Sequence, residues 1–183
     1  MRKVTYSMGV SLDGFIAGPS GDIAWSAPDE ELHRFHNEQT RELRAHFLGR
    51  RLYEVMKYWE TAEPSAPGPE AEFARIWQAL PKIVFSTTLE SVVGNARLAR
   101  AGLAEEVAQL RDGPGGGLAV GGAGLAASFI ELGLVDEFGL FVSPVVLGAG
   151  TPFFPAGATI GLELVETRTF GSRVAYLRYR RAD

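Results

Sequence analysis

The spacing of hydrophobic and polar positions changes several times along the chain, and each change predicts an element of secondary structure. Alternating or continuous apolar runs predict strands at residues 3–10, 45–48, 82–86, 118–120, 135–146, 162–170 and 173–180. Apolar positions recurring every three or four residues predict helices at residues 28–44, from 49, at 103–110 and from 125. Helices thus alternate with strands to about residue 143, and only strands follow. This order predicts an α/β fold with a mainly parallel sheet, helices on both faces and an antiparallel C-terminal strand.

Composition narrows the classes of protein. A chain of 183 residues is expected to form a single domain, residues 1–183. The absence of cysteine excludes disulfides, thiolate nucleophiles and cysteine-bound metals. A net charge of −4 provides no general attraction to nucleic acid or to acidic membranes. Met1 is followed by a strand-like run instead of a signal segment, so we expect a cytoplasmic location.

A strand, a glycine pair and a helix follow one another between Leu118 and Leu134. The apolar run ends at Gly121-Gly122, and helical spacing begins beyond Gly124. Such a junction directs free backbone N–H groups and the positive end of a helix dipole toward one point, which suits a phosphate group. A tight strand-to-helix connection without a ligand explains the same residues, so the motif alone leaves both interpretations open.

Three further strand ends carry groups that suit a phosphorylated ligand. Ligands of open α/β sheets bind at the carboxyl ends of the strands. There the first strand leads into a glycine-rich loop (Ser11 to Trp25), the second into Gly49-Arg50-Arg51, and the third into Ser86-Thr87-Thr88. Two arginines without a carboxylate favour the 2′-phosphate of NADP over the ribose of NAD. A solvated basic pair at a helix start is the alternative for Arg50-Arg51.

Several other chemistries lack their motifs. The dinucleotide fingerprint, the phosphate loop of nucleotide hydrolases, the cysteine pair of zinc deaminases and the serine elbow of α/β-hydrolases are all missing. His33 and His36 have a spacing that two metal ligands use, but no third ligand lies near them in the sequence, so no metal site is predicted. Hydride transfer from a bound cofactor remains, because the cofactor then supplies the chemistry.

An ordered set of motifs resembles the dihydrofolate reductase-like superfamily. Within it, the branch related to the C-terminal reductase domain of bifunctional riboflavin-biosynthesis deaminase/reductase proteins is the most similar. The motifs are Val10-Ser11-Leu12-Asp13-Gly14-Phe15-Ile16-Ala17, Leu48-Gly49-Arg50-Arg51-Leu52-Tyr53-Glu54, Lys82-Ile83-Val84-Phe85-Ser86, Val120-Gly121-Gly122-Ala123-Gly124 and Ser143-Pro144-Val145-Val146-Leu147-Gly148. The resemblance implies a three-layer dihydrofolate reductase-like fold, NADPH as cofactor and a homodimer. Apolar groups at residues 145–147 and 153–154 are candidates for the dimer interface, although a buried loop explains them equally well.

The resemblance also implies which residues bind NADPH. The segments that hold the nicotinamide carboxamide and cover the site correspond to Gly9, Val10, Ile16, Ala17 and Gly18. The residues that contact the pyrophosphate and the 2′-phosphate correspond to Gly49, Arg50, Arg51 and Leu52. The residues at the adenosine ribose correspond to Ser86 and Thr87. A second group at the pyrophosphate corresponds to Gly121, Gly122, Ala123, Gly124 and Leu125. A cis peptide is expected between Gly121 and Gly122, as in dihydrofolate reductases.

The substrate side departs from the family patterns. Asp13 and Trp25 are expected to hold a flat heterocycle, and Tyr53 and Met56 to shape its pocket. Glu30 is the nearest match to the pterin-binding acid, although it could simply open a helix. No arginine for a folate tail and no basic group for a ribosyl phosphate is identified. We therefore expect an NADPH-dependent reductase of a pyrimidine- or pterin-like molecule that resembles 5-amino-6-(5-phosphoribosylamino)uracil reductase; a dihydrofolate reductase and a non-catalytic NADP(H)-binding sensor or scaffold are the alternatives.

Overall fold

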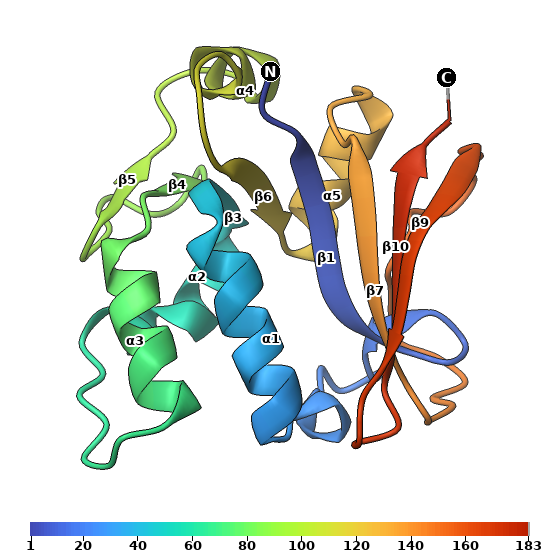
Figure 1. Ribbon diagram of the computed structural model, residues 1–183. Coiled ribbons are helices and arrows are strands. Elements are labelled where there is room, and N and C mark those ends of the chain that lie inside the picture. Colours follow the sequence, from blue (N-terminus) through green and yellow to red (C-terminus); the bar gives the residue numbers. More distant parts are fainter. Residues whose placement is uncertain (183) are drawn as a thin grey trace.

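Eight strands form one twisted central sheet in the computed structural model, which describes residues 1–182 (Figure 1). Their bounds are β1 Val4–Ser11, β3 Leu43–Gly49, β4 Lys82–Phe85, β5 Ala96–Leu98, β6 Gly117–Gly121, β7 Glu137–Ser143, β9 Leu162–Thr169 and β10 Ala175–Arg181. The order across the sheet is β5-β4-β3-β6-β1-β7-β10-β9. The first six strands in this order, β5 to β7, run parallel to one another, whereas β10 runs antiparallel to both β7 and β9. The predicted parallel sheet with an antiparallel C-terminal edge is confirmed.

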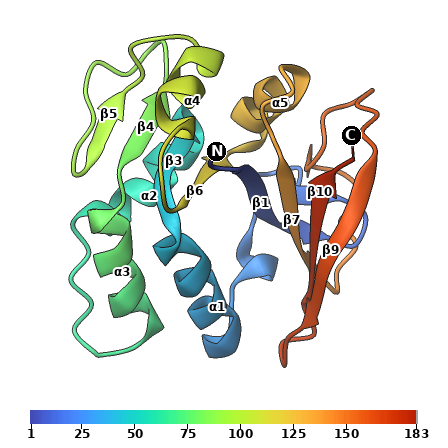
Figure 2. The same cartoon turned by 45° about the horizontal axis from the view of Figure 1, so that its top comes forward.

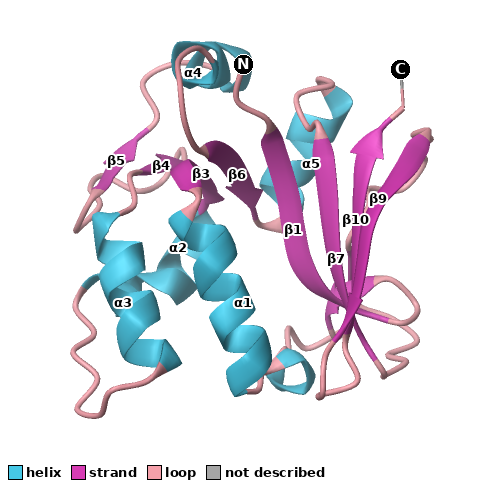
Figure 3. Cartoon of the chain, in the orientation of Figure 1, coloured by secondary structure: helices cyan, strands magenta, loops and turns pink. Residues whose placement is uncertain are grey.

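Helices cover both faces of this sheet (Figures 2 and 3). Their bounds are α1 Glu30–Arg41, α2 Arg50–Met56, α3 Pro69–Ala79, α4 Leu103–Arg111 and α5 Ala123–Glu131, with short 3₁₀ turns η1 Ala24–Ser26 and η2 Lys57–Glu60. A small separate ribbon pairs β2 (Phe15–Ala17) with β8 (Thr151–Pro152). No helix within residues 1–182 has the length and apolar character needed to cross a membrane.

Local sequence explains where two of the helices begin. The side chain of Asp29 accepts a hydrogen bond from the N–H of Leu32 at 2.9 Å and so caps α1. Pro69 occupies the first position of α3, where its missing N–H costs nothing. Sequence patterns left residues 70–81 unassigned, yet α3 lies there and buries Trp77. Its other buried residues are two alanines, which give little hydrophobic signal.

The two faces of the sheet are packed differently. On the face covered by α4 and α5, Tyr6 and Phe47 pack with Phe129 of α5 into one continuous core, each fully buried. On the opposite face there are two smaller cores: one beside α3 contains Trp77, and one beside the start of α1 contains Tyr176. The sheet between these two cores, beneath α1, carries mainly small side chains, and this stretch forms the floor of the candidate site.

Candidate active site

Three strand ends that sequence patterns singled out lie side by side. In the register of the sheet, Leu48 of β3 is opposite Gly121 of β6, and Gly49 is opposite Phe85 of β4. Gly49, Ser86 and the Gly121-Gly122 turn therefore share one edge of the sheet. A Cβ atom built on Gly49 would lie 3.4 Å from the Cβ of Leu125, so the first turns of α2 and α5 touch. We call this edge the strand-end corner.

The two glycines of the corner are required for different reasons. A Cβ on Gly121 would lie 2.5 Å from Cδ2 of Leu52 and 2.9 Å from Nε2 of His46, so a side chain has no room there. Gly122 has a φ of +92°, a conformation that residues with side chains rarely adopt. The expectation of a cis peptide between Gly121 and Gly122 was wrong, because residues 1–182 contain no cis bond. The positive φ of Gly122 turns the chain into α5 instead.

The corner fits the phosphate groups of a dinucleotide. The N-caps of α2 and α5 are Gly49 and Gly122, so among the described residues no side chain caps the first-turn N–H groups of either helix. Arg50 adds a guanidinium group beside these N–H groups. A Cβ built on Gly124 would meet nothing within 4 Å, so the first turn of α5 is open to a ligand. Backbone donors, a cation and open access occur together, as phosphate binding requires.

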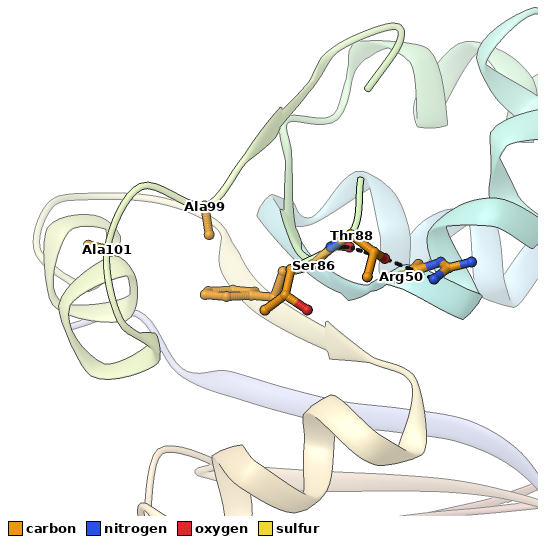
Figure 4. A pocket seen from close by; sticks show the side chains of 7 residues that line it. Arg50, Ser86, Thr88, Ala99 and Ala101 are labelled. Carbon is orange, nitrogen blue, oxygen red and sulfur yellow. Dashed lines mark hydrogen bonds between the residues drawn. The ribbon is translucent and has the colours of Figure 1, made fainter. Parts of the chain in front are cut away.

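A shallow pocket of about 560 Å³ continues from the corner past β4 (Figure 4). Arg50 donates to Oγ1 of Thr88 at 2.8 Å and to Glu54 at 3.0 Å, and Oγ of Ser86 accepts from the N–H of Thr88. The pocket is also lined by Phe85, Thr87, Ala99 and Ala101. Arg51 does not line it and is exposed to solvent. Hydroxyls, an arginine and small apolar groups suit the adenosine part of a cofactor.

The loop after β1 is tied down by a carboxylate. Asp13 accepts hydrogen bonds from Oγ of Ser11 at 2.7 Å, from the N–H of Leu147 at 3.1 Å and from the N–H of Gly148 at 2.7 Å. The bond from Ser11 is the largest cause of a lowered pKa at Asp13, followed by the backbone bond from Leu147. Asp13 thus joins two loops at the end of the sheet through these three hydrogen bonds.

Other residues expected to hold the nicotinamide lie around this loop. Ile16 and Ala17 belong to β2, and the N–H of Gly18 donates to the carbonyl of Asp22 at 2.9 Å. Val10 turns its side chain into the core, where it is 1% exposed, so only its backbone is available to a ligand. Gly9 lies on the other face of β1 and faces the space described next.

A cavity of about 960 Å³ lies between α1 and the sheet. β1 pairs with β6 only as far as Tyr6 opposite Val120, whereas its pairing with β7 continues to Ser11. The strands therefore separate at the carboxyl end of β6, and Met8 and Gly9 line the cavity there. The floor carries small side chains on β1 and β6, namely Thr5, Ser7, Gly9, Gly117 and Ala119. Because these fill little volume, α1 encloses open space instead of a packed core.

Three polar atoms on residues that line the cavity are buried without a hydrogen-bond partner within residues 1–182: Oγ of Ser7, Nδ1 of His46 and Nε1 of Trp77. Unpaired buried polar groups are costly, and they mark places where a ligand or water completes the bonding. Burial, with a smaller contribution from nearby Lys82, lowers the pKa of His46 to about 4. His46 is therefore neutral at physiological pH.

The remaining two histidines also line this cavity. His36 lies against Phe141, with ring centroids 4.3 Å apart, and burial lowers its pKa to about 4. His33 lies near Phe73, and burial again lowers its pKa. Among the described residues, no group of three histidine, aspartate or glutamate side chains is arranged to hold a metal ion. All three histidines are thus neutral parts of the cavity wall.

The structure distributes the expected substrate residues unevenly. Met56 lines the cavity. Tyr53 does not, which corrects the expectation: it is 3% exposed in the core beside α3, and its hydroxyl accepts from the N–H of Val93 at 2.8 Å. Nε1 of Trp25 donates to the carbonyl of Asp22 at 3.0 Å, outside the cavity lining. Glu30 is exposed and pairs with Arg34 at 2.7 Å, because it occupies the solvent side of the first turn of α1.

Sequence reasoning missed the polar residues of the cavity. It placed Val4, Tyr6 and Met8 together on one strand face, and all three pack in the core of that face; Met8 also borders the cavity where β1 and β6 separate. The alternation of Thr5, Ser7 and Gly9 with large apolar neighbours was the available signal. His46 and Trp77 left no comparable signal, because they meet only through the packing of α3 on the sheet.

Two apolar segments were expected at a dimer interface. Phe153 is instead buried and stacks on Tyr6, with ring centroids 4.3 Å apart. Val146, by contrast, is 66% exposed. A buried loop thus explains part of this segment, and the homodimer stays a prediction.

Comparison with known proteins assigns the family. Over residues 2–176 the sequence matches the family described as the RibD C-terminal domain. The chain belongs to the RibD C-terminal domain family. The uncharacterized protein YyaP of Bacillus subtilis (strain 168) is 34% identical over 183 residues, covering 97% of this chain and 94% of YyaP. The resemblance inferred from the ordered motifs is confirmed.

Solved structures agree on the fold of this RibD C-terminal domain. A putative riboflavin biosynthesis protein of Shewanella sp. PV-4 has a TM-score of 0.78 at 19% identity, with both chains fully covered. The Thermotoga maritima diaminohydroxyphosphoribosylaminopyrimidine deaminase/5-amino-6-(5-phosphoribosylamino)uracil reductase has a TM-score of 0.68 at 18% identity, covering 99% of this chain and 57% of that one. Dihydrofolate reductase of Enterococcus faecalis, complexed with NADP(H), has a TM-score of 0.63 at 17% identity, covering 99% and 97%. At such identities the likeness shows the fold alone, and it confirms the dihydrofolate reductase-like architecture.

Proposed function

We propose that this RibD C-terminal domain protein is an NADPH-dependent reductase of a pyrimidine- or pterin-like heterocycle. One observation carries the proposal: the strand-end corner and the cavity share a wall. Leu52 lines the cavity, and its Cβ is 3.6 Å from the position that a Cβ on Gly122 would occupy. A dinucleotide with its phosphates at the corner can therefore reach the cavity mouth beside Met8 and Gly9.

The corner provides the groups that would hold NADPH. Its 2′-phosphate and adenosine would lie with Arg50, Arg51, Ser86 and Thr87. Its pyrophosphate would lie with the backbone of Gly49, Leu52, Gly121, Gly122, Ala123, Gly124 and Leu125. Its nicotinamide would lie with the backbone of Gly9, Val10, Ile16, Ala17 and Gly18. When bound, NADPH would supply a hydride, while the protein supplies orientation and a cavity that excludes water. The reductases among the fold relatives and the NADP(H) complex of the Enterococcus enzyme support this assignment.

The proton that accompanies the hydride would need a donor near Met8 and Gly9, and the two acids closest to that role do not fit it. Glu30 is 70% exposed and paired with Arg34. Glu137 lines the cavity, but it is far from this position along the sheet. In the register of β1 and β7, Glu137 lies opposite Thr5, whereas Gly9 lies opposite Phe141, four residues further along β7. Four residues of strand span about 13 Å. We therefore propose that a water molecule at the cavity mouth delivers the proton.

Two alternatives are weaker. Dihydrofolate as substrate calls for an acid beside the heterocycle, and the exposure of Glu30 argues against it. A cofactor-binding sensor without turnover needs only the corner, whereas this protein also has a large cavity directly beside it. The size of this cavity and its mixed polar and apolar lining support the binding of a second molecule.

Binding and turnover test the proposal separately. NADPH at about 100 times its dissociation constant should stabilise the protein by about 2.7 kcal/mol in a thermal-shift assay, and NADH should bind more weakly. With NADPH deuterated at C4 of the nicotinamide, mass spectrometry of the reduced heterocycle should reveal one deuterium per product. Failure of NADPH to shift the unfolding transition would refute the cofactor assignment. Binding without deuterium transfer to any pyrimidine or pterin would favour the sensor.

A further inference from the structure

The charged groups on the cavity wall are mostly negative. Among the described lining residues there are four carboxylates, Glu38, Glu42, Glu137 and Glu166. Against them stand only two guanidinium groups, Arg41 and Arg178. An anionic ligand entering this cavity would therefore meet a wall of its own sign.

Both arginines already have carboxylate partners. Arg41 pairs with Glu72 at 2.5 Å. Arg178 lies between two carboxylates, 3.2 Å from Glu137 and 3.0 Å from Glu166. Glu137, which is 7% exposed, also pairs with Lys3. To bind a phosphate, Arg178 would have to give up its pairs with Glu137 and Glu166 or bring the anion beside these two carboxylates, and both are unfavourable.

The histidines do not supply the missing positive charge. His36 and His46 have pKa values of about 4, and the pKa of His33 is also lowered, in each case chiefly by burial. By contrast, the strand-end corner outside the cavity presents the half-exposed Arg50 and the exposed Arg51. Arg51 is exposed and Arg50 pairs with Glu54 at 3.0 Å, so among the described residues the corner has two cations and one partner carboxylate, whereas the cavity wall has two cations and four carboxylates.

The wall instead offers uncharged partners. Ser7, His46 and Trp77 contribute uncharged polar side chains to the lining, and Met8 and Phe141 add apolar and aromatic surface. Such a lining suits the flat faces and the neutral N–H and C=O edges of a heterocycle. The cavity volume of about 960 Å³ leaves room for an uncharged substituent as well.

We propose that the substrate is an uncharged planar heterocycle without a phosphate or carboxylate group. This inference rests on the proposed reductase function and specifies its substrate class. It distinguishes this protein from the Thermotoga relative, whose described reductase substrate is a phosphoribosyl compound. The selectivity comes from the excess of carboxylates on the wall, from the pairing of Arg41 and Arg178 with carboxylates, and from the neutrality of the histidines.

Matched ligand pairs test the inference in the 183-residue protein saturated with NADP⁺. Isothermal titration would compare pterin with pterin-6-carboxylate, lumazine with 6-carboxylumazine, and uridine with uridine 5′-monophosphate. We expect at least one uncharged member to bind, and to bind about tenfold or more tightly than its anionic partner. Equal or tighter binding of the anionic members, or no binding by any uncharged member, would overturn the inference.

A charge variant tests the cause. In Glu166→Gln, Arg178 loses one of its two carboxylates, so the ratio of anionic to uncharged affinity should rise about fivefold or more. Glu163→Gln is the matched control, because Glu163 makes a similar pair with Arg180 between β9 and β10 but does not line the cavity. An unchanged ratio in Glu166→Gln, or the same rise in both variants, would refute the role of Arg178.

The outcomes remain separable from the proposed function. A separate NADPH titration decides whether the cofactor binds, and the heterocycle titrations can be repeated in protein without NADP⁺. Cofactor binding together with a preference for anionic heterocycles would keep the reductase and refute the substrate class. Binding of uncharged heterocycles without any response to NADPH would keep the ligand class and refute the NADPH-dependent reductase.

Discussion

Acidification below pH 6.5 should destabilise this protein through His46. In the folded state this side chain lies on β3 with its Nδ1 buried and unpartnered, and its ring is 5.6 Å from that of Trp77. The buried ammonium of Lys82, held by Glu60 at 2.7 Å, adds a repulsive charge nearby. Protonation of the half-buried imidazole would thus place a second cation close to Lys82.

The magnitude follows from the two pKa values. Burial lowers the pKa of His46 from 6.5 to about 4. Between these values the unfolded state binds a proton and the folded state does not, so the free energy of unfolding falls as pH falls. Each pH unit of difference is worth about 1.4 kcal/mol, which gives a loss of about 2 kcal/mol at pH 5 and about 3 kcal/mol near pH 4. His36 has the same pKa and should contribute a similar loss.

Urea denaturation at pH 7, 6 and 5 measures this effect. The wild-type protein should lose stability steadily over this range, and His46→Gln should show about half of the loss, because His36 remains. His33→Gln is the matched control, since His33 is less buried and should change the slope less. A slope in His46→Gln equal to that of wild type would refute the reasoning, as would titration of the His46 ring near pH 6.5 by NMR in the folded protein.

Three substitutions test other parts of the site. Gly121→Ala should destabilise the fold by about 1–3 kcal/mol in urea denaturation, because its methyl group would collide with Leu52 and His46. Gly124→Ala is the control and should not destabilise the fold, because a Cβ there meets nothing within 4 Å. Arg51→Ala should weaken NADPH about tenfold and NADH hardly at all in binding titrations, and equal losses would argue against 2′-phosphate recognition. Glu30→Gln should change kcat less than about twofold, because its side chain pairs with Arg34 in solvent; a loss of a hundredfold would restore it as a proton donor.

Local patterns predicted much of the corner. Glycines and arginines directly after strands mark the carboxyl edge of a parallel sheet, because every strand of such a sheet ends at the same edge. Gly49, Ser86 and Gly121 could therefore be grouped before the order of the strands was known. The positive φ of Gly122 could not, since the sequence equally allowed a cis bond, and only the path of the chain into α5 distinguishes the two.

The substrate side depended on long-range packing instead. Tyr53 and Met56 look alike in sequence, three residues apart on one helix, yet α3 buries the first and leaves the second facing the cavity. Helix α3 itself was not predicted from the sequence, because two of its three buried side chains are alanines. Its Trp77, which meets His46 only in the folded protein, was therefore missed as well.

The sequence by itself determined most of the order of strands and helices, apart from α3 and β5, together with the antiparallel C-terminal edge and the glycine turns of the strand-end corner. These features are encoded by residues close together in the chain, through side-chain alternation and turn geometry. The tertiary structure alone decided that the small residues of β1 and β6 lie beneath α1 and leave a cavity. It also decided that the cavity's arginines are paired and its histidines neutral. Charge and burial depend on partners far apart in the sequence, such as Arg178 and Glu137, so only the folded chain reveals them.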